Sequence, residues 1–208
     1  MASSGIQIVC VALTVLGLVG AIITCILPQW KVSAFIGDNI VTAQSTYEGI
    51  WKSCVVQSTG QQQCKDYDSL LVLSSDLQAS RAMTIVCCLL SGLALLIIFA
   101  GSDFTTCVQN EDIKPKICLA GGIMLLVAGL LIIIPVSWVA NQVVQNFNNV
   151  LVAQAQKREL GACIFIGWGS GVLMLLAGGL LCCFSRGSRG SSTTVKYSTH
   201  PSAPKNYV

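Results

Sequence analysis

Charge and histidine are scarce in this chain of 208 residues. Asp, Glu, Lys and Arg make up 10% of the sequence, and His200 is its only histidine. The long apolar runs contain no carboxylate, Lys or Arg, so they lack the groups that acid–base catalysis or proton-coupled transport would need. A nucleotide-binding glycine loop and a cluster of metal ligands are also lacking. The sequence therefore predicts that the protein is not an enzyme, carries no cofactor and binds no nucleic acid.

Apolar residues supply 53% of the chain, and the mean hydropathy is +0.72. A transmembrane helix needs about 20 apolar residues to cross roughly 30 Å of hydrocarbon. The first apolar run has no basic residue before it and no cleavage site after it, so we interpret it as a retained span rather than a signal peptide. The sequence predicts an integral membrane protein embedded in the lipid bilayer. The four predicted spans are about 7–27, 82–101, 117–136 and 161–183.

Lys and Arg residues beside the spans predict the orientation. Lys114 and Lys116 precede the third span, and Arg186 and Arg189 follow the fourth. By the positive-inside rule these ends face the cytoplasm, so both termini are predicted to be cytoplasmic. The two predicted outer loops are about 28–81 and 137–160.

The first outer loop has the composition of a small β-structure. Turn residues separate β-prone runs that predict short strands at 30–35, 39–43, 47–56 and 61–65. The last two strands would form a hairpin that brings Cys54 and Cys64 together. Because thiols in an oxidising outer loop pair, the sequence predicts a disulfide between them. Leucines at near-helical spacing predict a short helix over 67–79.

One set of residues in this loop resembles the signature of a known family. The set is Trp30, Gly49-Ile50-Trp51, Cys54 and Cys64. It is similar to the W, G-L-W, C, C pattern of the claudins, the four-span proteins of tight junctions, with Ile50 in place of the usual Leu. The resemblance covers nearly the whole chain, including Arg81 at the start of the second span. It is nearest to the barrier-forming members that bind an enterotoxin.

The resemblance implies a membrane α+β fold over residues 1–183. Claudins form a left-handed four-helix transmembrane bundle that carries an extracellular five-stranded antiparallel β-sheet, with four strands from the first outer loop and one from the second. The family lies in the plasma membrane at tight junctions, where protomers polymerise and meet those of the neighbouring cell. Trp30 and Trp51 would then tie the sheet to the bilayer, and aromatic anchoring at the membrane surface would explain them equally well.

Lys65 and Lys31 are the candidates for pore selectivity. Lys65 follows the second cysteine, at a position where the side chain of family members projects toward the paracellular pore. A lysine at this position would repel cations. The alternative is a solvated charge beside Asp66 and Asp68, screened over about 8 Å at physiological salt.

The second outer loop supplies candidates for contact with the neighbouring cell or with a clostridial enterotoxin. They are Phe147, Asn149, Leu151 and Val152. Enterotoxin-binding claudins read Asn-Pro-Leu-Val-Ala in this segment, whereas this chain has Val150 in place of the proline. Without the proline the free backbone samples more conformations, which opposes toxin recognition. The alternative is an ordinary loop that packs Leu151 on its own sheet.

The tail over 184–208 is rich in Ser, Gly, Thr and Pro, a composition that predicts disorder. It ends in Tyr207-Val208, whose carboxylate suits a PDZ domain that takes the peptide as an added strand. Together with the resemblance, this end predicts binding to zonula occludens scaffold proteins. Three cysteines on the inner side are candidates for palmitoylation, with buried thiols as the alternative. They are Cys107, Cys182 and Cys183.

Three functions fit the sequence. The leading one is a structural protein that polymerises into a paracellular barrier. The second is an anion-selective paracellular channel that uses Lys65, and the third is an auxiliary adhesion member of the wider claudin-like superfamily. Such auxiliary relatives often carry an N-glycosylation site in the first loop, and this chain has no Asn-x-Ser/Thr.

Deleting Tyr207-Val208 is expected to abolish binding to a zonula occludens PDZ domain. The deletion moves the terminal carboxylate and removes the apolar side chain that fills the domain's pocket. Fluorescence anisotropy of the tail peptide with the isolated PDZ domain measures the loss. An affinity that does not change on deletion would remove the basis for this interaction.

Overall fold

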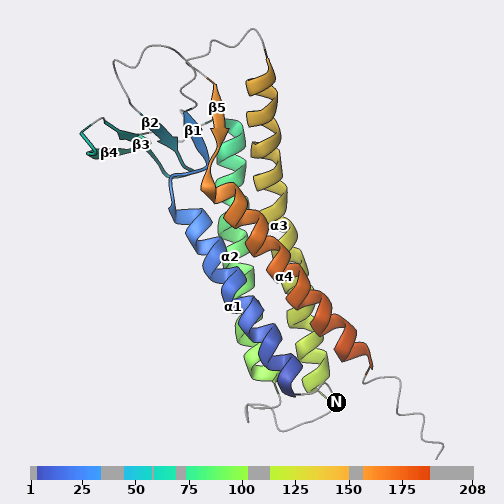
Figure 1. The fold of residues 1–208 in the computed structure, drawn as a ribbon. Helices are drawn as coiled ribbons and strands as arrows, with labels where there is room; N and C mark the ends of the chain where they lie inside the picture. The colour runs from blue at the N-terminus through green and yellow to red at the C-terminus, as the bar shows by residue number, and fades with distance from the viewer. Residues whose placement is uncertain are drawn as a thin grey trace, which may run out of the picture.

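The computed structural model describes residues 4–33, 45–57, 59–68, 74–102, 113–149 and 157–187. Its helices lie side by side in one tilted bundle (Figure 1). All four are long and apolar enough to cross a membrane, which agrees with the four predicted spans. The helices are α1 (Ser4–Ile26), α2 (Ser75–Gly101), α3 (Lys114–Asn148) and α4 (Ala162–Gly187).

The strands form one antiparallel sheet at one end of the bundle (Figure 1). Their order is β4-β3-β2-β1-β5, so the last strand, which precedes α4, pairs with the first. The predicted membrane α+β fold is confirmed, with four strands from the first loop and one from the second. The strands are β1 (Lys31–Ser33), β2 (Ser45–Glu48), β3 (Lys52–Val56), β4 (Gln62–Asp66) and β5 (Arg158–Leu160).

The strand predicted over 47–56 is wrong, because the structure divides this run into β2 and β3. The Gly49 N–H donates a hydrogen bond to the Lys52 carbonyl at 3.0 Å and closes a turn between them. Ile50 in this turn is fully buried, so packing on the bundle overrides the β-propensity of the run. The strand predicted over 39–43 lies outside the described residues, and β1 pairs with β2 instead.

The helices extend beyond the predicted spans. The separate short helix predicted over 67–79 is wrong in its described part, because Tyr67, Asp68 and Ser74 are not helical and the residues from Ser75 onward form the first turn of α2. α3 is 35 residues long and continues through Pro135 to Asn148. The length of an apolar run predicts only the part of a helix that lies in the hydrocarbon. α3 continues beyond its apolar run, and there its residues are held by packing against the rest of the protein. The buried residues of this extension are Val139, Ala140 and Val143.

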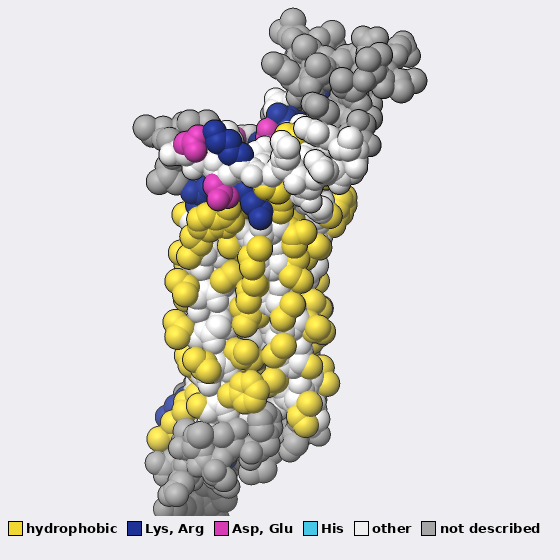
Figure 2. Space-filling view, turned by 90° about the vertical axis from the view of Figure 1, so that its left-hand side faces the viewer, with side chains coloured by type: hydrophobic (Ala, Val, Ile, Leu, Met, Phe, Trp, Pro, Cys, Tyr) yellow, Lys and Arg dark blue, Asp and Glu magenta, His cyan; other side chains and the backbone are white. Residues whose placement is uncertain are grey.

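The surface of the bundle separates lipid-facing from water-facing regions. Figure 2 shows a band of apolar side chains over the helices, which ends where the Lys, Arg, Asp and Glu side chains of the sheet begin. Large apolar side chains such as Leu89, Leu96 and Leu176 are more than half exposed on the helices. An exposed apolar surface of this extent is what a lipid environment requires.

α3 and α4 approach so closely that glycine is required at their contact. A Cβ atom on Gly178 would lie 2.7 Å from the Gly122 carbonyl oxygen. Small residues permit such approaches between membrane helices, where packing replaces the hydrophobic effect as the source of stability. The neighbouring Gly179 has open space at its Cβ position, so only one of the two glycines is fixed by the helix contact.

Gly178→Ala is therefore expected to destabilise the protein by about 1–3 kcal/mol, because the added methyl group meets backbone that cannot give way locally. Gly179→Ala is the matched control and should be neutral or stabilise the helix slightly. Thermal unfolding of both variants in detergent measures the difference. Equal melting temperatures would show that the α3–α4 contact tolerates a wider spacing.

Candidate functional site

Trp30 joins the sheet to two helices. Its side chain is fully buried, and its indole Nε1–H donates a hydrogen bond to the Thr24 carbonyl in α1 at 2.9 Å. Its backbone N–H donates to the Glu48 carbonyl in β2, and its own carbonyl accepts from the Gly161 N–H just before α4. Trp30 thus packs the sheet onto the helix ends, and its burial leaves no surface for anchoring in lipid.

The Gly49-Ile50-Trp51 turn fits against the segment between α1 and β1. An added Cβ atom on Gly49 would lie 2.4 Å from the Pro28 Cα atom, so a side chain there would displace backbone. Ile50 is buried in the same apolar cluster as Trp30. The Tyr67 hydroxyl donates to the Gly49 carbonyl at 3.2 Å. Close backbone contact explains the glycine, and the buried cluster explains the apolar residue after it.

Arg81 fixes this turn to the second helix. Its Nε–H donates to the Ile50 carbonyl at 2.9 Å, and Nη2 donates to the same oxygen. The guanidinium also lies over the Trp51 ring, 4.5 Å from the ring centroid. Trp51 is itself 39% exposed. One face of its ring covers the Arg81 guanidinium, and part of the side chain remains on the protein surface. Hydrogen bonds from a cation and stacking on an aromatic face reinforce each other here.

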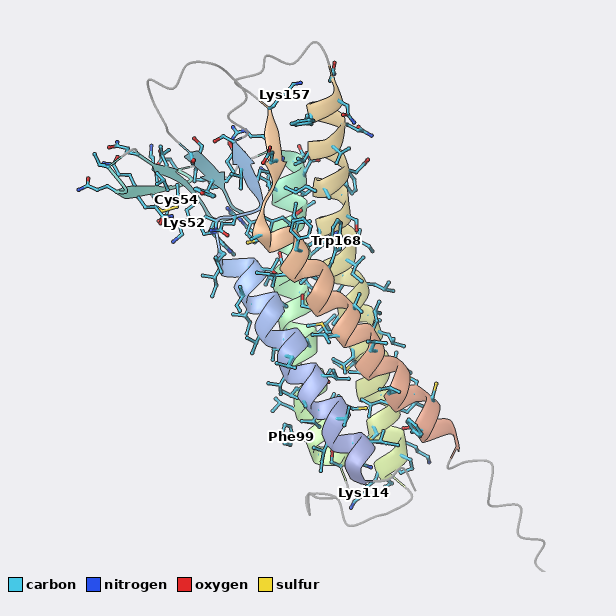
Figure 3. The ribbon with its side chains drawn as sticks, viewed as in Figure 1. Lys52, Cys54, Phe99, Lys114, Lys157 and Trp168 are labelled. Atoms are coloured by element: carbon cyan, nitrogen blue, oxygen red, sulfur yellow. A yellow bond between two sulfur atoms is a disulfide. The ribbon has the colours of Figure 1, made fainter. Side chains whose placement is uncertain are left out.

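The disulfide lies in the part of the sheet that projects beyond the bundle. Cys54 in β3 and Cys64 in β4 are directly opposite in the strand register and are joined. Figure 3 shows Cys54 away from the helices, on the side of the sheet formed by β3 and β4. Among the residues that the structure describes, the extensive contacts of β3 and β4 are with each other and with β2 rather than with the helices. The cross-link therefore holds the strand that packing supports least.

The strand register brings both candidate selectivity lysines to one face of the sheet. Lys31 is opposite Glu48, Glu48 is opposite Ser53, and Ser53 is opposite Lys65. Directly opposite residues of antiparallel strands point to the same face. These four residues therefore form one row, which we call the lysine row. Lys52, the residue before Ser53, points to the other face together with Asp66.

The two lysines of this row have different surroundings. Lys65 is exposed on β4 and forms an ion pair with Asp68, with 2.7 Å between Nζ and Oδ2. Its hydrogen bond to Asp68 raises the pKa of Lys65, so it carries its charge at physiological pH. Burial lowers the pKa of Lys31, and the nearby carboxylates of Glu48 and Asp76 oppose that shift. Exposed ion pairs contribute little stability, so Lys65 is available to solution ions.

Arg158 and Glu48 form an ion pair that the sequence reasoning missed. Nη2 of Arg158 in β5 lies 2.6 Å from Oε1 of Glu48 in β2, and both side chains are less than a third exposed. The register places Arg158 opposite Ser33, on the same face as the lysine row. This face therefore carries three cations and one carboxylate within the strands. The sequence does contain a basic residue and an acidic residue of opposite charge at these positions. Their pairing could not be predicted from it, because the strand order that brings β5 close to β2 is not visible in the sequence.

The remaining candidates are only partly described. Phe147 lies in the last turn of α3, and the Lys157 ammonium lies 5.1 Å from the centre of its ring. Asn149 follows as the C-cap of α3, whereas Leu151 and Val152 lie outside the described residues. Near the end of α4, Cys182 is half-buried and Cys183 is exposed. Cys107 and Tyr207-Val208 lie outside the described residues.

Comparisons with known proteins identify the family in which this arrangement occurs. Residues 4–181 match the model of the PMP-22/EMP/MP20/Claudin family. The chain is 53% identical over 222 residues to claudin-6 of Homo sapiens and 50% identical over 209 residues to claudin-4 of Bos taurus, with all of each chain covered. It is also 50% identical over 198 residues to claudin-3 of Homo sapiens, covering 94% of this chain and 90% of that one.

The chain belongs to the claudin family. Claudins are structural junction proteins, so the prediction that this chain is not an enzyme is confirmed. In this claudin the contacts of the signature residues lie where the sheet meets the helix ends; the residues are Trp30, Gly49, Ile50, Trp51 and Arg81.

Arg81→Gln is expected to destabilise this claudin by about 1–3 kcal/mol. The substitution removes charge-assisted hydrogen bonds and leaves the Ile50 carbonyl without a donor. Lys52→Gln, on the face of the sheet opposite the lysine row, is the control and should change stability by less than about 0.5 kcal/mol. Thermal unfolding in detergent, monitored by tryptophan fluorescence, compares the two. Equal stability of both variants would mean that neither the hydrogen bonds nor the stacking of Arg81 holds the turn.

Proposed function

We propose that this claudin is a structural protein of tight junctions, polymerising into strands that seal the paracellular space and set its ion permeability. The observation that carries the proposal is the rigid mounting of a charged sheet on a four-helix membrane bundle. Trp30 and Arg81 hold the sheet to α1, α2 and the start of α4. A sheet held in this way presents the same surface from every protomer, which a repeating strand of protomers requires.

The sheet is proposed to lie outside the cell, with both termini in the cytoplasm. The Cys54–Cys64 disulfide in the sheet supports this orientation, because disulfides persist in oxidising compartments. Lys114 and Lys116 begin α3 at the opposite end of the bundle, where the positive-inside rule favours the cytoplasm. The plasma membrane at the tight junction is the proposed location, and membership of the claudin family supports it.

A second candidate function, an anion-selective paracellular channel, is favoured by the charges on one face of the sheet. Lys31 and Lys65 share the lysine row, and Arg158 lies on the same face. Acidic residues accompany cation selectivity in the family, so a cationic face would favour chloride. Barrier and selectivity are compatible, since a strand that excludes most solutes can still leave narrow pores.

The proposed partners are other claudin protomers in the same and the neighbouring membrane, and zonula occludens scaffold proteins that bind Tyr207-Val208. Phe147, Asn149, Leu151 and Val152 are the proposed contacts with the neighbouring cell or a clostridial enterotoxin. Phe147 and Asn149 support this role because they lie at the end of α3, which is on the sheet side of the bundle (Figure 1). The exposed Cys183 and its neighbour Cys182 are proposed palmitoylation sites at the inner end of α4.

The NaCl dilution potential across a claudin-depleted epithelial monolayer tests the selectivity of the strands. Expression of the wild type is expected to raise resistance and to give a potential that favours chloride. Lys65→Asp should shift the potential toward sodium, because it replaces the cation of the lysine row and leaves Asp68 unpaired. Lys52→Asp makes the same charge change on the opposite face of the sheet and should leave the potential unchanged.

The outcomes separate the candidate functions. Raised resistance with equal potentials for wild type, Lys65→Asp and Lys52→Asp would mean a barrier in which Lys65 is only solvated. Equal shifts for both variants would mean that net charge matters and the lysine row does not. No rise in resistance, and no strands in freeze-fracture images, would overturn the structural role itself.

A further inference from the structure

Two cysteine side chains meet between α1 and α2, near the end of the bundle that carries the sheet (Figure 1). Cys25 is the last residue but one of α1, and Cys88 lies in α2 about two helical turns after Arg81. Their thiol groups are hydrogen-bond partners, and both cysteines are free in the structure. A disulfide joins only cysteines whose side chains face each other at short range, and this pair meets that requirement.

The surroundings of the pair hold the two side chains in place. The Trp51 indole, whose only polar group is the Nε1–H donor, donates a hydrogen bond to the Cys25 sulfur. Both cysteines pack on the apolar cluster that contains Trp30 and Ile50. Both are also half-buried, so part of each side chain stays outside the packed interior. A small molecule is therefore able to reach two thiols whose orientation is already fixed.

The position of the pair determines which kind of oxidant reaches it. α1 ends at Ile26, and Trp51, which contacts Cys25, is 39% exposed. Partly exposed tryptophans are typical of the membrane–water interface, so the thiols lie at the border of the hydrocarbon. A charged oxidant such as glutathione disulfide is costly to move out of water. Hydrogen peroxide is small and neutral, and it enters this region freely.

We propose that Cys25 and Cys88 form a second disulfide, between α1 and α2, on reaction with hydrogen peroxide. One sulfur attacks a peroxide oxygen, the O–O bond breaks, and a sulfenic acid and one water molecule form. The other sulfur then attacks the sulfenic sulfur, the S–S bond forms, and a second water molecule leaves. The two thiols lose two electrons and two protons, and the peroxide takes up both. A small dithiol reverses the reaction by thiol–disulfide exchange.

The link joins the bundle where its helices have the least contact. Among the neighbouring helix pairs that the structure describes, α1 and α2 have the least extensive contact. The sheet is attached to α1 through the hydrogen bond from Trp30 to the Thr24 carbonyl, and to α2 through Arg81. Cys25 follows Thr24 directly, and Cys88 lies about 10 Å along α2 from Arg81. The disulfide therefore fixes the two attachments relative to each other.

This inference concerns a single protomer in its bilayer, so it holds whether the strands seal or conduct. Oxidation of the purified full-length protein in nanodiscs tests it. Samples with and without hydrogen peroxide are alkylated and digested without reduction, and mass spectrometry locates linked peptides. We expect a peptide that joins Cys25 to Cys88, which dithiothreitol removes. A smaller amount of the same peptide in untreated protein supports the same site, because it records oxidation before purification.

The link is also expected to raise the unfolding temperature by about 5–10 °C, because a cross-link across a long loop restricts the unfolded chain. Thermal unfolding of the treated and untreated samples measures this shift. Glutathione disulfide at the same concentration should give at least about tenfold less of the linked peptide, because its charges keep it in water.

Three variants assign the link to these two cysteines. Cys25→Ala and Cys88→Ala should each remove both the linked peptide and the rise in unfolding temperature, because one partner is missing. Cys87→Ala is the matched control, since Cys87 is the neighbouring residue in α2 but is fully buried, and it should keep both effects. Each variant is compared with its own untreated sample, so a change in its starting stability does not affect the result.

Four results would overturn the proposal in whole or in part. Thiols of Cys25 and Cys88 that stay free, or that become sulfonic acids without a link, would show that the pair does not form a disulfide. A peptide that joins Cys25 to Cys87 would assign the link to another residue. A linked protein with an unchanged unfolding temperature would show that the link does not brace the two helices. Equal linkage by glutathione disulfide would show that the site does not select a neutral oxidant.

Discussion

The hydrogen bonds from Arg81 to the Ile50 carbonyl are the constraint on which the sheet's position depends. Arg81 lies in the second turn of α2, and Ile50 lies in the turn between β2 and β3, so the contact joins a membrane helix to the middle of the sheet. Stacking on Trp51 shields the cation, and a shielded cation bonds more strongly than one in water. Trp30, the residue before β1, provides the second attachment, to α1 and to the start of α4. Two attachments on different strands fix both the height and the rotation of the sheet, which one attachment would not do.

Support from the bundle decreases across the sheet, and the chemistry of the strands changes accordingly. β1 and β5 lie next to the helices and are held by Trp30 and by the Arg158–Glu48 ion pair. β3 and β4 project away from the bundle, where apolar packing is replaced by the disulfide (Figure 3). All residues of β4 are exposed. The disulfide thus lies where burial of apolar side chains contributes least to stability. Because Lys65 directly follows Cys64 in β4, the disulfide also holds this exposed lysine in position.

The sequence predicts the elements of this fold better than their limits. Uninterrupted apolar runs identify four spans because crossing hydrocarbon leaves few alternatives to a helix. The end of α3 was missed because residues 137–148 are polar on one face, and helicity there depends on packing that only the three-dimensional structure contains. The break at Gly49-Ile50-Trp51 was missed for the same reason, since the burial of Ile50 decides it. Cys54 and Cys64 were paired correctly because a hairpin leaves them one arrangement. Arg158 was missed because its partner Glu48 lies in another strand and a distant part of the chain.

The separation of the charged groups indicates where selectivity has to arise. Lys31 and Lys65 are three strand spacings apart in the lysine row, which amounts to about 14 Å. Screening at physiological salt acts over about 8 Å, so in water the two lysines of one protomer do not act on the same ion. Their fields combine only where low-dielectric walls confine the solution and focus the potential. A second sheet facing the first provides such a wall, and a single protomer does not. In the proposed strands, the charges of this sheet would therefore act on permeating ions only after assembly, and the rigid mounting by Arg81 and Trp30 would hold the facing sheets in register.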